Sequence, residues 1–191
     1  MKKFIAILTI LMTVLVLNGC ESDSTIDAED LFNASFVDGV FHDEIAEFTF
    51  HLPNGWRYFP ESELRLISQD MSERSGETMV YTMIANDQTN DTGVVMIWEE
   101  MVGFGQRDWN AINEIIMIAD MYHNRADVRE ISSSSTVTIG GHEYERIRIY
   151  FYEFQGLTDG TLTFFARRIE NFMFSFSISG SMDNNVLEYF E

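Results

Sequence analysis

Residues 172–179 alternate strictly between large apolar and small or flexible side chains. The large apolar side chains share one parity, at Phe172, Phe174, Phe176 and Ile178. Because successive side chains of a β-strand point to opposite faces, this pattern predicts a strand with one strongly apolar face. Residues 47–52 alternate in the same way. A chain built from such segments is constrained to form an antiparallel sheet with one face against a core.

Other elements are predicted from the same periodicities and from turn residues. Pro, Asn and Gly at residues 52–55 and the pair Gly140–Gly141 favour turns. Further strands are predicted at residues 56–59, 78–86, 93–99, 128–139, 142–153 and 161–169. A short helix is predicted to begin at residues 60–64, a long one to span 108–123, and a last one to run from Ser181 or Asp183 through Phe190. Strands with few, separated helices predict an antiparallel α+β fold, with helices packed on the sheet.

The long helix is predicted to pack on this sheet through an apolar stripe. Its apolar residues recur with helical spacing, at Ile112, Ile115, Ile116, Ala119 and Tyr122. Asp108 is a suitable N-cap residue. We therefore expect these isoleucines to lie in the core.

The N-terminus has the pattern of a bacterial lipoprotein leader. Lys2 and Lys3 precede an apolar run over residues 4–17, which as a helix would be about 21 Å long. A hydrocarbon core is about 30 Å thick, so residues 1–19 are predicted to be a signal peptide rather than a membrane span. The run ends in Leu-Asn-Gly-Cys, a lipobox that predicts lipidation of Cys20. We expect a lipid anchor on the extracytoplasmic face of the cell membrane. An ordinary secretory leader with one cysteine is the alternative.

Residues 20–38 contain several acids and no base, and are expected to form a flexible tether before a folded domain at 39–191. The chain has 31 acids against 12 bases, a formal charge of −19. Both lysines lie in the leader, so its removal lowers the charge to −21. Such a chain repels phosphate backbones, which excludes nucleic acid as a partner. A single cysteine excludes an internal disulfide.

Two motifs carry a resemblance to a known family. The series FTFHLPNGW, a short helix, a hairpin, one long helix, VTIGGHEYERI, two strands and a final helix resembles the PsbP-like bacterial lipoproteins. Their fold is that of the photosystem II PsbP subunit and the Ran-binding Mog protein. The resemblance covers residues 40–191 and implies an α/β/α sandwich and a non-enzymatic accessory or binding role. It also implies that the last helix would run a turn or two beyond Glu191.

The sequence contains none of the catalytic motifs sought: no Gly-x-Ser-x-Gly elbow, no Gly-rich phosphate loop and no Cys–His pair. The histidines lack metal-ligand spacing: His42, His51, His123 and His142. Residues 87–93 are similar to a calcium loop, but Thr92 stands at the glycine position and Trp98 at the final glutamate position. We therefore expect no enzyme activity, no cofactor and no metal.

Four of the arginines lie in two consecutive predicted strands, as Arg146, Arg148, Arg167 and Arg168. One parity of the first strand holds Arg146, Arg148, Tyr150 and Tyr152. Arginine and tyrosine are enriched in binding hot spots, so these four predict a face for a protein partner. The alternative is a solvated face whose arginines pair with Glu145, Glu153 or Glu170.

Together these features predict a lipid-anchored, non-catalytic interaction or accessory module at the cell envelope. Two alternatives stay open: a hydrolase that uses paired carboxylates, and a lipoprotein that binds a small ligand. A deep pocket with paired, perturbed carboxylates would favour the hydrolase, and a shallow aromatic and arginine face would favour the interaction module.

Overall fold

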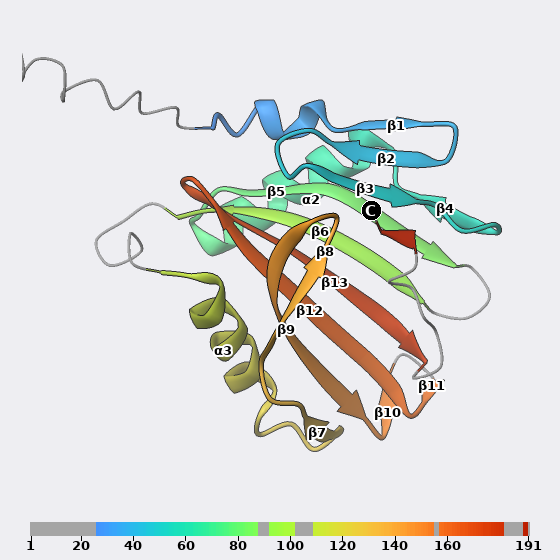
Figure 1. Cartoon of the computed structure of the whole chain (residues 1–191), viewed down its shortest axis with the longest axis vertical. Helices are drawn as coiled ribbons and strands as arrows, with labels where there is room; N and C mark the ends of the chain where they lie inside the picture. Colours follow the sequence, from blue (N-terminus) through green and yellow to red (C-terminus); the bar gives the residue numbers. More distant parts are fainter. Residues whose placement is uncertain (1–25, 88–91, 102–108, 155–156, 182–188, 191) are drawn as a thin grey trace, which may run out of the picture.

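The computed structural model describes residues 26–87, 92–101, 109–154, 157–181 and 189–190. Its main element is an eight-stranded antiparallel sheet of order β4-β5-β6-β13-β12-β9-β7, with β8 also paired to β9 (Figure 1). The strands of this sheet are β4 Trp56–Tyr58, β5 Met79–Asp87, β6 Gly93–Glu100, β7 Val128–Ile131, β8 Ser135–Ile139, β9 His142–Phe151, β12 Gly160–Ile169 and β13 Phe172–Ser181. The antiparallel α+β class predicted from the sequence is therefore confirmed.

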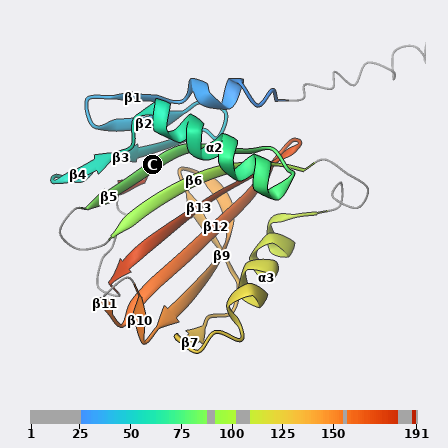
Figure 2. The same ribbon diagram turned by 180° about the vertical axis from the view of Figure 1, so that it is seen from behind.

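Smaller elements surround this sheet. A second sheet has the order β1 Ser35–Val37, β2 Val40–Asp43 and β3 Phe48–His51, and β10 Glu153–Phe154 pairs with β11 Leu157–Thr158. The helical elements are the 3-10 turn η1 Asp30–Asn33 and the helices α2 Glu61–Ser75 and α3 Ala111–Tyr122. The helices α2 and α3 lie on the side of the large sheet that faces the viewer in Figure 2.

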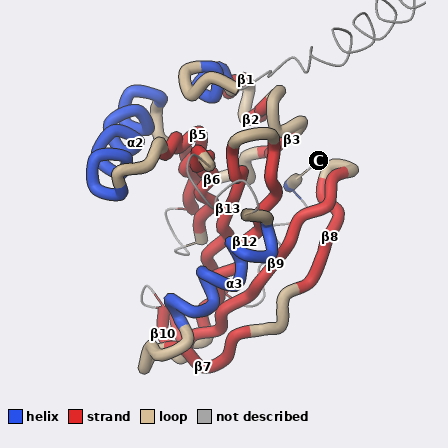
Figure 3. Tube along the Cα trace, turned by 90° about the vertical axis from the view of Figure 1, so that its left-hand side faces the viewer, coloured by secondary structure: helices blue, strands red, loops and turns tan. Residues whose placement is uncertain are grey.

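The large sheet has a core on each face, because its side chains alternate. Tyr144 of β9 and Phe165 of β12 belong to the core shared with β1–β3. Ile149 of β9 and Leu162 of β12 belong to the core shared with α3. In side view the helices lie on one side of the sheet and β1–β3 on the other (Figure 3). Among the described residues, the layer opposite the helices is thus a small sheet rather than the helical layer of the expected α/β/α sandwich.

Aromatic rings dominate the core between the two sheets. Phe165 stacks on Phe176 with ring centroids 4.5 Å apart, and Phe48 lies 5.3 Å from Phe176. Phe190 packs 4.8 Å from Phe50 and forms an isolated antiparallel bridge with it. The predicted helix from Ser181 or Asp183 lies mostly outside the described residues, but at its expected end Phe190 is in this bridge and not in an α-helix.

Helix α2 lies against the part of β5 that β4 does not pair with. Ser68 Oγ accepts a hydrogen bond from the Tyr81 N–H at 2.9 Å and donates to the Leu64 carbonyl at 2.8 Å. Ser72 Oγ accepts from the Met79 N–H at 2.9 Å. An unpaired strand edge invites pairing with another chain, so α2 both satisfies and covers this edge.

Both helices differ from their predicted form. The predicted short helix is the fifteen-residue α2, which ends at Ser75 and is capped by Gly76 in the left-handed region. Only Leu64 and Ser68 of α2 are buried, so its polar sequence gave little helical signal. The N-cap of α3 is Asn110, whose side chain accepts from the Asn113 N–H at 3.0 Å. The predicted cap, Asp108, lies outside the described residues.

The side of α3 that is buried against the sheet differs from the predicted one. Ile115 and Ile118 are buried against β9 and β12, whereas Ile112 and Ile116 are 46% and 50% exposed. Apolar residues occur on more than one side of α3, so periodicity alone does not decide which side faces the sheet. The prediction that Ile112 and Ile116 are core residues was wrong.

Two segment boundaries also differ. The expected tether at residues 20–38 overlaps η1 and β1, and Leu31 is buried in the aromatic core. The strand predicted over residues 128–139 is divided into β7 and β8, because the chain leaves the ladder at residues 132–134. The tight turn between β8 and β9 is confirmed, since Gly140 and Gly141 both have positive φ angles.

Candidate functional site

The structure brings together three of the four predicted face residues. Arg146, Arg148 and Tyr150 alternate along β9 on the side away from α3, and each is half-buried. Tyr152 lies beyond the end of β9 and is 61% exposed, and its backbone bonds to Asp127 and Asp159. We call Arg146, Arg148 and Tyr150 the β9 face.

The two arginines of the β9 face bind neutral groups. Arg146 donates from Nε and Nη2 to Ser135 Oγ, at 3.2 and 2.9 Å, and Arg148 donates from Nε to Thr163 Oγ1 at 3.2 Å. Among the described residues, no carboxylate lies within ion-pair distance of either arginine. Ion pairs of Arg146 or Arg148 with Glu145, Glu153 or Glu170, the alternative weighed above, are thus absent from the described part of the chain.

Other arginines of the molecule are paired with acids. Arg65 lies 2.8 Å from Glu61 and Arg74 lies 2.9 Å from Asp70, both on α2. Arg125 lies 2.6 Å from Asp127. The guanidinium groups of the β9 face, like those of Arg57 and Arg167, instead bind neutral groups in a strongly acidic protein.

Arg167 and Arg168 have structural roles instead. Arg167 donates from Nη2 to the Ala46 carbonyl at 2.6 Å and lies 5.2 Å from the ring centroid of Tyr144. It thereby ties β12 to the turn between β2 and β3. Arg168 donates to the carbonyls of Glu170 and Trp109, on the α3 side of the sheet.

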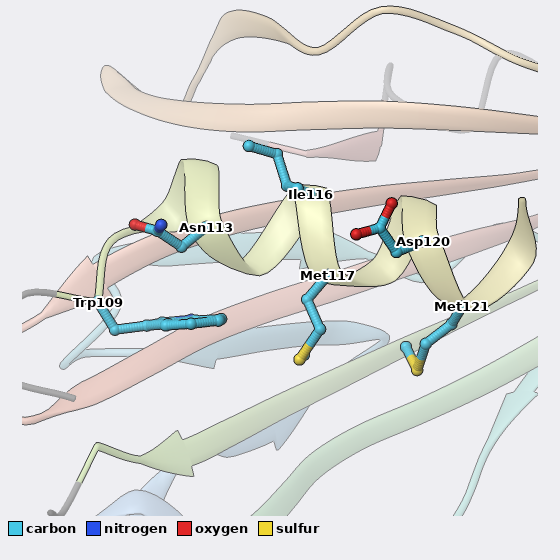
Figure 4. A pocket seen from close by; sticks show the side chains of 6 residues that line it. All are labelled: Trp109, Asn113, Ile116, Met117, Asp120 and Met121. Carbon is cyan, nitrogen blue, oxygen red and sulfur yellow. The ribbon is translucent and has the colours of Figure 1, made fainter. Parts of the chain in front are cut away.

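The outward side of α3 forms a second candidate surface, which sequence reasoning missed. Four exposed apolar side chains lie on this one helix: Ile112, Ile116, Met117 and Met121. Three of them, Ile116, Met117 and Met121, border an open depression of about 510 Å³ together with Trp109, Asn113 and Asp120. Trp109, Met117 and Met121 point to the same side of the helix, while Ile116 points to the other (Figure 4). The sequence signal that could have revealed this surface is that α3 contains more apolar residues than one buried stripe can hold.

Three glutamates meet where the two helices approach β6. Burial, a hydrogen bond with Glu77 and the charges of Glu114 and Glu77 raise the pKa of Glu99 from 4.5 to about 8. Burial also raises the pKa of Glu114, although its Oε2 accepts a hydrogen bond from Trp109 Nε1 at 3.1 Å. Neither the depression beside α3 nor a second cavity, beneath η1, is lined by these glutamates. Carboxylates with raised pKa values, as expected of a hydrolase, are thus present, but neither of these two cavities contains them.

The remaining sequence candidates have local explanations or lie outside the described residues. His142 Nε2 lies 2.8 Å from Glu47, and His42 Nδ1 lies 3.2 Å from Thr49 Oγ1. The calcium-like loop falls largely on residues 88–91, and Cys20 on the leader, neither of which is described. Within the described ranges, no three potential ligand side chains are grouped to hold a metal ion. In those ranges we also find no helix with the length and apolar content of a membrane span.

Comparison with known proteins gives a likeness of fold. No protein-family model matches the sequence, and no curated protein is significantly similar to it. Among solved structures, the chain is similar to cyanobacterial PsbP from Synechocystis sp. PCC 6803, with a TM-score of 0.49 and 11% sequence identity. The match covers 82% of this chain and 94% of the cyanobacterial one.

Proposed function

We propose that this protein is a PsbP-like lipoprotein, anchored through Cys20 on the extracytoplasmic face of the cell membrane, that acts as a non-catalytic interaction module. Its β9 face would bind an acidic segment of a partner protein. The observation that carries this proposal is the pair Arg146 and Arg148, which bind only hydroxyl groups in a chain of formal charge −19. The leader and lipobox support the location.

The chemistry of arginine suits this role. A guanidinium has five N–H donors, and the contacts to Ser135 and Thr163 leave donors of both arginines available for a carboxylate. Arginine binds carboxylates through two parallel hydrogen bonds, and Tyr150 adds an aromatic contact beside them. An acidic segment is repelled by the rest of the surface and attracted here, so the field would orient the encounter.

The test is a double substitution, Arg146→Gln with Arg148→Gln, and a matched control, Arg65→Gln with Arg74→Gln. Both remove two positive charges, but the control arginines are ion-paired on α2. The probe is a labelled peptide that alternates Glu and Tyr, and its affinity is measured by fluorescence anisotropy at low salt. We expect a loss of roughly tenfold or more for the first variant. The control should change the affinity about twofold or less, because its charges lie far from the β9 face and salt screens their attraction to the peptide. Equal losses in the two variants would contradict binding at the β9 face.

The anchor is tested separately. Cys20→Ala should abolish metabolic labelling with a lipid precursor and release the protein from the membrane fraction. Labelling that persists in this variant would contradict lipidation at Cys20.

A hydrolase is the second candidate, and the paired carboxylates favour it. A protonated Glu99 beside Glu77 is an arrangement that could supply a general acid at neutral pH. Wild type and Glu99→Gln are compared on chromogenic ester and glycoside substrates. Turnover that Glu99→Gln abolishes would favour the hydrolase, and absence of turnover on both substrate types would favour the interaction module.

A further inference from the structure

A small, mostly apolar cavity lies beneath η1, and its lining includes residues of the N-terminal sheet, α2 and β5. Its volume is about 230 Å³. The N-terminal segment, the start of α2 and β5 enclose it, and these lie side by side in Figures 1 and 3. Most lining side chains are aromatic or aliphatic: Leu31, Phe32, Ala34, Phe36, Phe41, Tyr58, Phe59, Pro60, Leu64 and Met83.

One polar side chain in this lining has no partner. Thr82 is the extra residue where the ladder between β5 and β6 shifts register, between Tyr81 and Met83. It is only 7% exposed, and no described group bonds to its Oγ1. Bulges re-aim side chains, and here the bulge places Thr82 among the residues that line the cavity, with its Oγ1 buried. Because a buried hydroxyl without a partner is costly, this site favours a ligand that supplies one hydrogen bond.

The walls are ordered by contacts of their own. Phe36 stacks on Tyr58 with ring centroids 3.8 Å apart. Arg65 lies 4.0 Å over the ring of Phe32 and pairs with Glu29 at 3.3 Å and with Glu61 at 2.8 Å. Arg65 thereby ties η1 to α2 beside the cavity. It also neutralises Glu61, the acid in the lining.

We infer that this cavity binds a small, flat, uncharged molecule that carries one hydroxyl or carbonyl group, with its rings among the aromatic walls and its polar atom at Thr82 Oγ1. An apolar cavity of about 150 Å³ is sufficient for benzene, so this volume suits a molecule of one or two rings. None of the β9-face residues lines the cavity, so this inference is independent of the proposed function.

The experiment compares two probes of nearly equal shape, 2-naphthol and 2-methylnaphthalene. The full-length protein is reconstituted in nanodiscs with ¹³C-methyl methionine, and the probes are titrated by NMR. In the wild type we expect 2-naphthol to bind about fivefold to tenfold more tightly, because only it can bond to Thr82. Thr82→Val should bring the affinity ratio to about one. The matched control Thr138→Val, at an exposed position of β8, should keep the wild-type ratio.

The methionine resonances report where the probes bind. Met83 lines the cavity, whereas Met117 and Met121 border the depression beside α3. We expect the Met83 methyl resonance to shift and those of Met117 and Met121 to stay. Ala34→Leu, which fills the cavity, should abolish the Met83 shift. Arg146→Gln with Arg148→Gln should leave it unchanged. Shifts confined to Met117 and Met121, a ratio that Thr82→Val does not change, or no shift of Met83 would each overturn the inference.

Discussion

Helices α2 and α3 lie on the same side of the large sheet but present opposite kinds of surface to solvent. The outward side of α2 is mostly polar and charged: it carries the ion pairs Arg65–Glu61 and Arg74–Asp70, beside one exposed apolar residue, Leu66. The outward side of α3 is apolar, with Ile116 and Met121 at 50% and 61% exposure. Among the described residues, no ion pair involves an α3 side chain.

The difference shows that the two helices are held by different interactions. Helix α2 is held through hydrogen bonds that Ser68 and Ser72 accept from backbone N–H groups at the edge of β5, so it needs few apolar residues. Helix α3 is held by Ile115 and Ile118 against β9 and β12, which leaves its other apolar side chains uncovered. Contiguous exposed apolar residues mark interaction surfaces, and methionine adapts to varied partners. The exposed apolar side chains of α3 are therefore not needed to hold the helix on the sheet, and they form part of its outer surface.

The strongest test of this comparison is a pair of substitutions on neighbouring residues of α3. Ile115→Ala should lower the free energy of unfolding by about 3 kcal/mol, because it leaves a cavity at a fully buried position. Ile116→Ala, the matched control, should lower it by about 0.5 kcal/mol or less. Urea denaturation measures both. Similar losses for the two variants would mean that Ile116 also packs in the core.

On α2 the corresponding test removes one hydroxyl. Ser68→Ala leaves the Tyr81 N–H without its acceptor at the covered edge of β5. An unsatisfied buried donor costs about 1–3 kcal/mol, and we expect a loss in that range in the same denaturation assay. Ser62→Ala, at an exposed position of α2, should be nearly neutral. A neutral Ser68→Ala would show that α2 does not depend on this contact.

The glutamates that meet where α2 and α3 approach β6 predict that the stability of this region depends on pH. The pKa of Glu99 is about 8 in the folded state against an ordinary 4.5, so the folded state binds this proton more tightly. The resulting stabilisation is fully present below about pH 4.5 and is lost as pH rises through about 8. Because Glu99 is partly exposed, solvent screening reduces the effect to about 1–2 kcal/mol. We expect the Tm to fall between pH 5 and 9, by roughly 2–4 °C for each kcal/mol.

Two variants assign this pH dependence. Glu99→Gln should flatten the profile and stabilise the protein most at pH 9. Glu143→Gln, on an exposed side chain of β9, should keep the wild-type slope. If Glu99→Gln retained the full slope, the dependence would belong to other buried carboxyls, such as Glu114, whose pKa is also raised by burial.

Much of the sheet was predictable because alternation is a local signal. The strands around Phe174 and Ile97 were found from the period of two and the turns beside them, within one or two residues of their observed ends. The helices were harder, for opposite reasons. The sequence of α2 has too few apolar residues to show its length, and that of α3 has too many to show its buried side.

The candidate site was predictable only in part, again for a physical reason. Parity placed Arg146 and Arg148 on one face of β9. Their hydroxyl partners, Ser135 and Thr163, come from β8 and β12, and only strand pairing brings these side chains together. The shift in register at Thr82 arises from pairing between β5 and β6 and leaves no mark in the sequence of either strand.

The bridge between Phe50 and Phe190 has a consequence for the order in which the protein folds. Phe190 packs on Phe48, Phe50 and Phe176, which come from widely separated parts of the chain. Contacts between distant residues carry a large loop-closure entropy and form slowly. The hairpin of β12 and β13, by contrast, closes over a short turn and needs no distant partner. The aromatic core between the two sheets is therefore completed late, and the rings of Phe48, Phe50 and Phe176 lack the cover of Phe190 until residue 190 has emerged.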